Sequence, residues 1–369
     1  MQKTNSAICA SIFIVVALFS SNNSIAQYEF NHLVDLTHTS VKDQCMTGTC
    51  WSYSTCSFLE SEAARISGHV VDISEMSNVR YTYPLKAEKY IRYHGKHQFG
   101  PGSLCHDVIN VVSGWGICPE EEYTGLKEGE TKHDHSALDS VLLATVEDIL
   151  KKSSGTLDPN WVDNVNKILD EYLGELPKSF EYSGKLYTPE SFRDYLGIDP
   201  SNYINLSSFT HHPFGASFIL EVPDNFSHGE FLNLPIDDLQ RAVEAAVVNG
   251  YTVAWDADVS EKGFSFSNGM AILPEQSEMG NLWNEVVKEQ KVTQHSRQIG
   301  FEDQTTTDDH LMHIVGLATD QSGAKYFIIK NSWGTGNKYG GFQYVSMPYF
   351  RAKTIAVLLH KDAIKRLMQ

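Results

Sequence analysis

The sequence predicts an α+β fold in which a helical lobe faces a β-rich lobe, with a helical insertion between them. Two observations support this prediction. In the first half of the chain, apolar residues recur at the three- and four-residue spacing of buried helix faces. After residue 207, short runs rich in β-branched and aromatic residues replace that pattern. Helices and strands segregated in this way along a chain form separate layers, and the boundary between two lobes is a common place for a functional site.

Residues 1–26 are predicted to be a secretory signal peptide. Lys3 precedes an apolar run at residues 8–19, and small residues follow at 24–26, which is the order of a charged region, an apolar core and a cleavage site. The alternative is an N-terminal membrane anchor, but the apolar run is shorter than the roughly 20 residues that a spanning helix needs. We therefore expect export to the periplasm or the extracellular space, with no stable membrane anchor after cleavage.

The helical lobe is predicted at residues 27–124 and contains three helices. The first begins at Cys50 and ends at Gly68, because glycine tolerates the left-handed conformation that often terminates a helix. Two more helices are expected at about residues 74–93 and 104–113, each followed by glycines.

The helical insertion is predicted at residues 125–206, where further apolar stripes are typical of core-facing helices and are assigned no chemistry. The β-rich lobe is predicted at residues 207–369 and includes one helix, with Pro235 at its first position and Gly250 at its end. Strands are expected in this lobe at residues 217–222, 251–259, 269–273, 310–318, 326–330 and 341–345.

The charge of the chain argues against one class of partner. The formal net charge is −17, and the acidic residues are spread along the sequence and not gathered in a tail. Binding of a phosphate backbone depends on clustered lysine and arginine, so we expect no nucleic-acid partner.

The cysteines indicate a reactive thiol. An odd number follows the signal peptide, namely Cys45, Cys50, Cys56, Cys105 and Cys118. In an exported chain this predicts one free thiol and up to two disulfides among the other four residues. Three pairings of those four are open, and so is the alternative that they are buried and unpaired.

Cys50 is the strongest candidate nucleophile. A helix N-terminus lowers the pKa of a thiol through its unpaired N–H groups and its dipole, and only the thiolate attacks efficiently. Gly48 permits a close approach of the backbone to a substrate. Gln44, six residues before Cys50, can direct its side-chain amide at the oxygen that becomes negative during attack on a carbonyl. A buried helix cysteine beside a core tryptophan is the alternative for Cys50 and Trp51 alone.

Two later segments supply the partners that such a nucleophile needs. His310 stands at the start of a predicted strand and is expected to take the thiol proton and return it to the leaving amine. Asn331 follows another predicted strand, where its side-chain oxygen can fix the tautomer and orientation of the imidazole. Trp333 is expected to shield that hydrogen bond from water. These residues predict a cysteine peptidase acting through an acyl-thioenzyme, which requires neither a metal nor an organic cofactor.

In these three segments the chain resembles the papain family, whose catalytic residues follow the order Cys, His, Asn. The matching features are the interval from Gln44 to Cys50, the pair Asp309–His310, and the sequence at residues 331–334. The resemblance implies a papain-like two-lobe fold, peptide or polypeptide substrates, and supporting positions at Asp309 and Trp333.

The long interval between Cys50 and His310, and the little space between the cleavage site and Gln44 for an inhibitory propeptide, resemble the bleomycin hydrolase and aminopeptidase C branch. Residues 72–76, 114–119 and 255–259 also resemble local patterns of that branch. Members of the branch form hexamers, so the resemblance raises a homo-oligomer as an expectation.

Two departures from the branch bear on specificity. A Gly-Gly pair that helps to hold the substrate backbone corresponds here to Gly102 and Ser103, so Gly102 is the candidate substrate-binding residue. The branch ends in an arm whose terminal carboxylate holds the substrate α-amine, whereas this sequence ends soon after its last predicted strand, with Lys365 and Arg366 near the end. Because these cations would repel an amine, we expect some cleavage of N-terminally blocked peptides, unless the insertion supplies the block.

Several alternatives remain at this stage. His313 competes with His310 for the role of base, but residues three apart on a strand point to opposite faces, and only His310 matches the family pattern. The histidines at 133 and 135 are interpreted as part of a solvated loop, and those at 211 and 212 as a turn, in preference to metal ligands. For the whole protein, the rivals are a non-catalytic peptide-binding homologue and a Cys/His/Asn acyl transferase.

Overall fold

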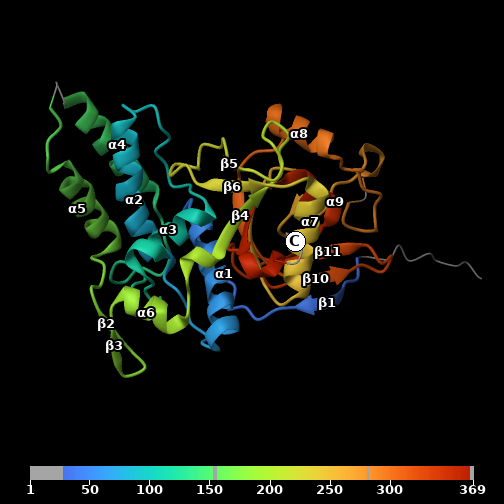
Figure 1. Cartoon of the computed structure of the whole chain (residues 1–369), viewed down its shortest axis with the longest axis horizontal. Coiled ribbons are helices and arrows are strands. Elements are labelled where there is room, and N and C mark those ends of the chain that lie inside the picture. Colours follow the sequence, from blue (N-terminus) through green and yellow to red (C-terminus); the bar gives the residue numbers. More distant parts are fainter. Residues whose placement is uncertain (1–27, 153–155, 281, 366–369) are drawn as a thin grey trace, which may run out of the picture.

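The computed structural model describes residues 28–152, 156–280 and 282–365. Figure 1 shows a group of helices packed beside a large twisted sheet, with α1 between the two. The predicted signal peptide lies outside the described residues. Within the part of the chain that the structure describes, no helix combines the length and the apolar character needed to cross a membrane.

The helical lobe is built on α1 (Cys50–Ser67), α2 (Glu75–Arg92) and α3 (Cys105–Trp115). α1 is buried over its first fourteen residues, because it has helices on one side and the sheet on the other. It ends at Gly68, whose φ of 75° favours glycine. The Ser74 side chain caps α2 by accepting from the Ser77 N–H. All three expected helices are present.

The region between residues 125 and 206 contributes α4 (Ser136–Lys152), α5 (Trp161–Leu173), α6 (Pro189–Leu196) and the short η1 (Pro200–Asn202). α4 and α5 pack on each other and on α2. A hairpin of β2 (Phe180–Tyr182) and β3 (Lys185–Tyr187), which the sequence patterns did not predict, also lies in this region. These strands have three residues each, too few to show a period of two, and Ser183 and Gly184 turn between them with positive φ.

The second lobe contains an eleven-stranded, mostly antiparallel sheet in the order β5-β6-β4-β13-β7-β10-β11-β12-β9-β8, with β1 paired to β10. Its strands are β1 (Asn31–Asp35), β4 (Tyr203–Ser207), β5 (Ser217–Ile219), β6 (Glu230–Asn233), β7 (Val253–Ala257), β8 (Phe264–Ser265), β9 (Met270–Ala271), β10 (His310–Thr319), β11 (Lys325–Lys330), β12 (Phe342–Ser346) and β13 (Thr354–His360). The accompanying helices are α7 (Ile236–Val248), α8 (Gln294–Glu302), α9 (Met347–Lys353), η2 (Gln276–Glu278) and η3 (Lys361–Ile364). Each expected strand segment overlaps one of these strands. Pro235 and Asn249 flank α7, so proline precedes the first helical residue instead of occupying it.

Buried polar contacts join α1 to the sheet and fix the position of this helix, which carries the candidate nucleophile. Ser54 donates from Oγ to the carbonyl oxygen of Met312 at 2.6 Å. Ser57 Oγ lies 2.8 Å from His313 Nδ1 and accepts from Lys330 Nζ at 2.8 Å. Residues on one helix are thereby tied to β10 and β11, the strands that carry the other candidate catalytic residues.

The five described cysteines are all free thiols, so the structure contains no disulfide among the described residues. Cys45 is half-buried, and the other four are buried. The sequence left open whether the other four cysteines form disulfides, and in the structure they are unpaired.

Candidate active site

Cys50 is the first residue of α1, as predicted, and its exposed fraction is only 9%. The backbone N–H of Leu311, the residue after His310, forms a hydrogen bond with the thiol. The expectation that the helix N-terminus lowers the thiol pKa is wrong for the unliganded protein. Burial, together with the charges of Asp308, Asp256 and Asp224, raises the pKa of Cys50 to about 12, although the Leu311 N–H opposes the shift.

His310 is the first residue of β10, and Asn331 follows the end of β11. His310 Nε2 lies 2.8 Å from Asn331 Oδ1. The Asn331 amide is fixed in this orientation, because its Nδ2 donates to Gln343 Oε1 at 2.6 Å and the Ser332 N–H donates to its Oδ1 at 2.7 Å. Nε2 therefore carries the proton, which leaves Nδ1 as the basic nitrogen. Gln343 was not singled out from the sequence.

Burial lowers the pKa of His310 to about 4, although the Asn331 hydrogen bond opposes this shift. With the thiol pKa raised to about 12 and the imidazole pKa lowered to about 4, burial favours the neutral form of each group. An ion pair would have to form as the substrate arrives.

Trp333 lies on the imidazole, as expected. The two ring centroids are 4.4 Å apart and the rings are inclined by 25°. Phe264 and Phe266 contact the same tryptophan edge-on. Asp309 turns toward the loop after β7, where it accepts from Thr307 Oγ1 at 2.6 Å and from the Val259 N–H at 3.2 Å. Any support from Asp309 therefore acts through this loop.

The side-chain amide of Gln44 is held from both sides. Its Oε1 accepts from Ser332 Oγ at 2.7 Å, and its Nε2 donates to the Thr47 carbonyl at 2.8 Å. Because a primary amide has two N–H groups, the second proton on Nε2 is available for another acceptor. This arrangement links the amide to Ser332, which directly follows Asn331.

Gly48 and Gly102 are positions of close approach. A Cβ on residue 48 would lie 2.5 Å from Pro101 Cγ, so Gly48 makes room for Pro101. Trp51 Nε1 donates to the Pro101 carbonyl at 2.9 Å and holds the same segment. A Cβ on residue 102 would lie 2.0 Å from Asp224 Oδ2, so the carboxyl group of Asp224 lies directly against Gly102.

Three carboxyl groups near the thiol were missed by sequence reasoning as functional residues. Asp256 lies in the middle of β7, Asp308 lies two residues before His310, and Asp224 lies in the loop between β5 and β6. The one available signal was Asp256, because a carboxylate is unexpected in the apolar run of a buried strand. The other two approach Cys50 only through the tertiary fold.

His313 is fully buried and contacts Ser57 of α1, which fits its interpretation as a core residue. The segment with His133 and His135 pairs with the loop before Cys50, since the Met46 N–H donates to the His133 carbonyl and the His135 N–H to the Met46 carbonyl. His135 is buried, so its interpretation as part of a solvated loop is wrong, and burial lowers its pKa to about 4.

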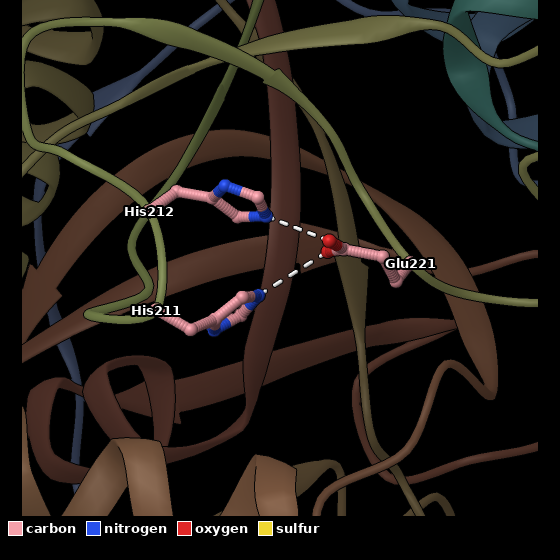
Figure 2. A group of neighbouring side chains, drawn as sticks. All are labelled: His211, His212 and Glu221. Atoms are coloured by element: carbon pink, nitrogen blue, oxygen red, sulfur yellow. Dashed lines mark hydrogen bonds and ion pairs between the residues drawn. The ribbon is translucent and has the colours of Figure 1, made fainter.

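His211 and His212 lie in a turn, as expected, and both imidazoles are directed at Glu221 (Figure 2). The Nε2–Oε distances are 3.2 Å and 2.6 Å, and the three ligand atoms lie within the range that a metal ion could bridge. Gln298 Nε2 lies 2.9 Å from His211 Nδ1, while the Gln298 Oε1 accepts from the Thr210 N–H. His211 Nδ1 is therefore the acceptor, and its Nε2 proton is donated to Glu221. These hydrogen bonds hold the start of the loop that carries Asp224.

Comparison with known proteins is consistent with this geometry. Residues 109–369 match the Peptidase C1-like family. The chain is 21% identical to Aminopeptidase G of Lactobacillus delbrueckii subsp. lactis over 95% of this chain and 90% of that protein. It is also 21% identical to Aminopeptidase W of the same organism, over 90% and 83% of the two chains. The crystal structure of PepW from Lactobacillus rhamnosis HN001 superposes with a TM-score of 0.71 at 15% identity, covering 92% of this chain and 85% of that one.

The matched region covers well over half of the chain and includes His310 and Asn331. The protein therefore belongs to the Peptidase C1-like family, and it has the papain-like fold. It is a cysteine-type peptidase, and its substrates are peptides.

Proposed function

We propose that this protein is an aminopeptidase-like cysteine peptidase in which Cys50 is the nucleophile and His310 the general base. In this proposal Asn331 orients His310, Trp333 shields their hydrogen bond, and Gln44 binds the oxyanion. The observation that carries the proposal is the 2.8 Å contact between His310 Nε2 and Asn331 Oδ1. Trp333 stacks on the His310 ring, and the N–H of the next residue, Leu311, contacts the Cys50 thiol.

The resting state defines the first step of the reaction. As the Cys50 sulfur attacks the substrate carbonyl carbon, its proton passes to His310 Nδ1, because neither group is ionised beforehand. The negative charge on the carbonyl oxygen is then stabilised by the free N–H of Gln44 Nε2 and the backbone N–H of Cys50. The imidazolium returns its proton to the leaving amine, and the C–N bond breaks to leave a thioester.

Hydrolysis of the thioester repeats these steps with water as the nucleophile. His310 takes a proton from water as the oxygen attacks the acyl carbon, and it returns the proton to the Cys50 sulfur as the C–S bond breaks. The products are the free acid and the regenerated thiol. Asn331 and Trp333 keep the imidazole in one orientation through both halves of the cycle.

Two observations support action at the amino terminus of peptides. Aminopeptidases G and W are similar to this chain over nearly its whole length. Three carboxyl groups lie close enough to Cys50 to raise its pKa, and carboxyl groups attract an α-ammonium group. The expectation that blocked peptides are cleaved, which depended on Lys365 and Arg366, stays a prediction. Paired substrates with free and acetylated amino termini separate the two expectations.

The proposed nucleophile is tested by substitution. Cys50→Ala should lose peptide hydrolysis by about 10³-fold or more while unfolding at the temperature of the wild type. Cys45→Ala is the matched control, because this thiol is half-buried nearby and has no proposed role. Hydrolysis by Cys50→Ala at the wild-type rate would contradict the mechanism.

An added amine acceptor tests the rival function, since an acyl transferase would form the joined product in preference to the free acid.

Export is also a proposal, because the signal peptide lies outside the described residues. Its support is the order of Lys3, the apolar run at residues 8–19 and the small residues at 24–26. N-terminal sequencing of the protein from a fractionated host should find a new terminus at residue 27 in the exported fraction. Recovery of the intact terminus with the cell interior would contradict export.

A further inference from the structure

Three carboxyl groups, those of Asp256, Asp308 and Asp224, are placed by the fold near the proposed nucleophile. Asp256 on β7 pairs in register with Leu311 on β10, so the two side chains lie on the same face of the sheet. Leu311 belongs to the core shared with α1, and its N–H contacts the Cys50 thiol. Asp256 therefore faces the helical lobe at the level of the nucleophile. Asp308 lies beside it, since the two carboxyl groups interact directly.

Asp256 is buried and, among the described residues, has no cation paired with it. Its exposed fraction is 1%, and among the described residues no donor bonds to either of its carboxyl oxygens. Asp308 has a buried Oδ2 in the same condition. Within the described part of the chain, Asp256, Asp308 and Asp224 take part in no salt bridge. Buried carboxyl groups without partners are costly, and native proteins normally pair them with a cation or with hydrogen-bond donors.

Asp224 places a third carboxyl group beside the segment that the family resemblance assigns to the substrate backbone. Its Oδ2 occupies the space next to Gly102, and its Oδ1 accepts from Gln98 Nε2 at 2.6 Å. Burial raises the pKa of Asp224, and the charge of Lys86, whose Nζ donates to the Gly102 carbonyl oxygen, opposes this rise. Substrate that extends past Gly102 would meet this carboxyl group.

We propose that Asp256 and Asp308, with Asp224 at the edge, bind the α-ammonium group of the substrate's N-terminal residue. In a substrate whose first carbonyl carbon is at the Cys50 sulfur, the α-nitrogen is about 2.5 Å from that carbon. A carboxyl oxygen binds this nitrogen through a charge-assisted hydrogen bond of about 2.8 Å, so a carboxyl group that recognises the amine has to lie beside the thiol. The inference rests on the proposed peptidase function and adds to it the group that selects a free amino terminus.

The electrostatics of the site agree with this role. The pKa of Asp308 is raised to about 7, first by burial and then by Asp224, and the pKa of Asp256 is raised well above its ordinary value. A bound ammonium group would stabilise the ionised carboxyl groups and offset their effect on Cys50, so the correct substrate would itself promote formation of the thiolate. An acylated amine carries no charge and would not stabilise the ionised carboxyl groups.

The test compares three anilide substrates of one side chain: leucyl anilide, its N-acetyl derivative, and the 4-methylpentanoyl derivative that lacks the amine. In wild type, kcat/KM should be highest for the free amine. Asp256→Asn and Asp308→Asn should lower the ratio of kcat/KM for leucyl anilide to kcat/KM for the 4-methylpentanoyl anilide by about 30-fold or more. Asp148→Asn on α4 removes one exposed carboxylate and is the matched control.

The outcomes separate the inference from the function on which it rests. If no substrate is cleaved by wild type, the proposed function fails. If wild type cleaves all three but Asp256→Asn and Asp308→Asn keep its selectivity, these two carboxyl groups have only a structural role. The inference then fails while the proposed function stands. A chain ending at Lys365 should keep the selectivity, and its loss there would place the amine site in residues 366–369 and overturn the inference. Acetyl-lysyl-leucyl anilide is a further substrate, in which the ammonium group is on a side chain and not on the amino terminus. Cleavage of this substrate in preference to leucyl anilide would also overturn the inference.

Discussion

At the scale of single residues, the surroundings of Cys50 and His310 favour the neutral thiol and the neutral imidazole. Both groups are buried, which disfavours their charged forms, and nearby carboxyl groups disfavour the thiolate further. The position of Cys50 at a helix N-terminus was predicted, but this local effect is outweighed by desolvation. Reactivity of the thiol therefore depends on what occupies the site.

We expect alkylation of Cys50 by iodoacetamide to be slow at pH 7 and to increase with pH up to at least pH 10. The reason is that only the thiolate reacts and that the thiol pKa is raised to about 12. Asp308→Asn removes a negative charge, lowers the thiol pKa, and should increase the rate at pH 8. The measurement is the rate of adduct formation at Cys50 by mass spectrometry. A rate that is already maximal at pH 7 would show a preformed thiolate and contradict this account.

The two residues around the imidazole should differ in effect. His310→Ala removes the base and should lower kcat by about 10³-fold or more, whereas Asn331→Ala leaves the base but frees its orientation and should lower kcat by roughly 10- to 100-fold. His313→Ala should leave kcat within about threefold, although it removes a buried contact with Ser57. Steady-state kinetics of the three variants decide this order. An inactive His313→Ala beside an active His310→Ala would reverse the assignment.

At the scale of elements, the start of α1 is shaped by the segment around Pro101. Gly48 precedes the helix and packs against the Pro101 ring, while Trp51 within the helix donates to the Pro101 carbonyl. The sequence reading gave Gly48 the role of admitting substrate. The structure shows instead that its missing side chain admits Pro101, which places Gly102 beside Asp224.

We expect Gly48→Ala to lower kcat/KM by about tenfold, because a Cβ would lie 2.5 Å from Pro101 Cγ and displace the segment next to the nucleophile. In a Pro101→Ala background the same substitution should have a smaller effect, since the atom it meets is gone. A double-mutant cycle on kcat/KM measures this coupling. Equal effects of Gly48→Ala in both backgrounds would show that Pro101 is not the cause.

At the scale of the whole molecule, the two lobes are held together by buried charges as well as by the apolar core. Lys330, next to Asn331, donates from Nζ to Thr39 Oγ1 and Ser57 Oγ, both at 2.8 Å. Burial raises the pKa of Glu60 on α1, and the positive charge of Lys330 opposes this rise. These interactions link the helix that begins at Cys50 to the strand that leads to Asn331.

We expect Lys330→Met to destabilise the protein by about 3–5 kcal/mol, because it leaves the Glu60 carboxylate buried with one cation fewer. The double variant Lys330→Met with Glu60→Gln should recover part of this loss, since the uncompensated charge is removed too. Urea unfolding of the single and double variants, followed by circular dichroism, gives the comparison. A change below about 1 kcal/mol in Lys330→Met would mean that the apolar contacts alone join the lobes.

The sequence by itself was sufficient for the features that depend on neighbouring residues. The helix from Cys50 to Gly68, the helices after Ser74 and Leu104, and the strands around His310 were predicted, because helix caps, glycine stops and apolar periodicity are local signals. The segments with Cys50, His310 and Asn331 were likewise recognised from short patterns.

Only the tertiary structure decided which groups surround the nucleophile. Asp224, Asp256 and Asp308 are distant from Cys50 in the chain, and no local pattern reports that strand pairing and a loop bring them to its thiol. Desolvation is also a property of the packed molecule, so the raised pKa of Cys50 could not be derived from its place at a helix N-terminus. The proposed catalytic residues can be recognised from short segments of the sequence. Their ionisation, and the charge of the groups around the thiol, depend on the long-range packing of the two lobes.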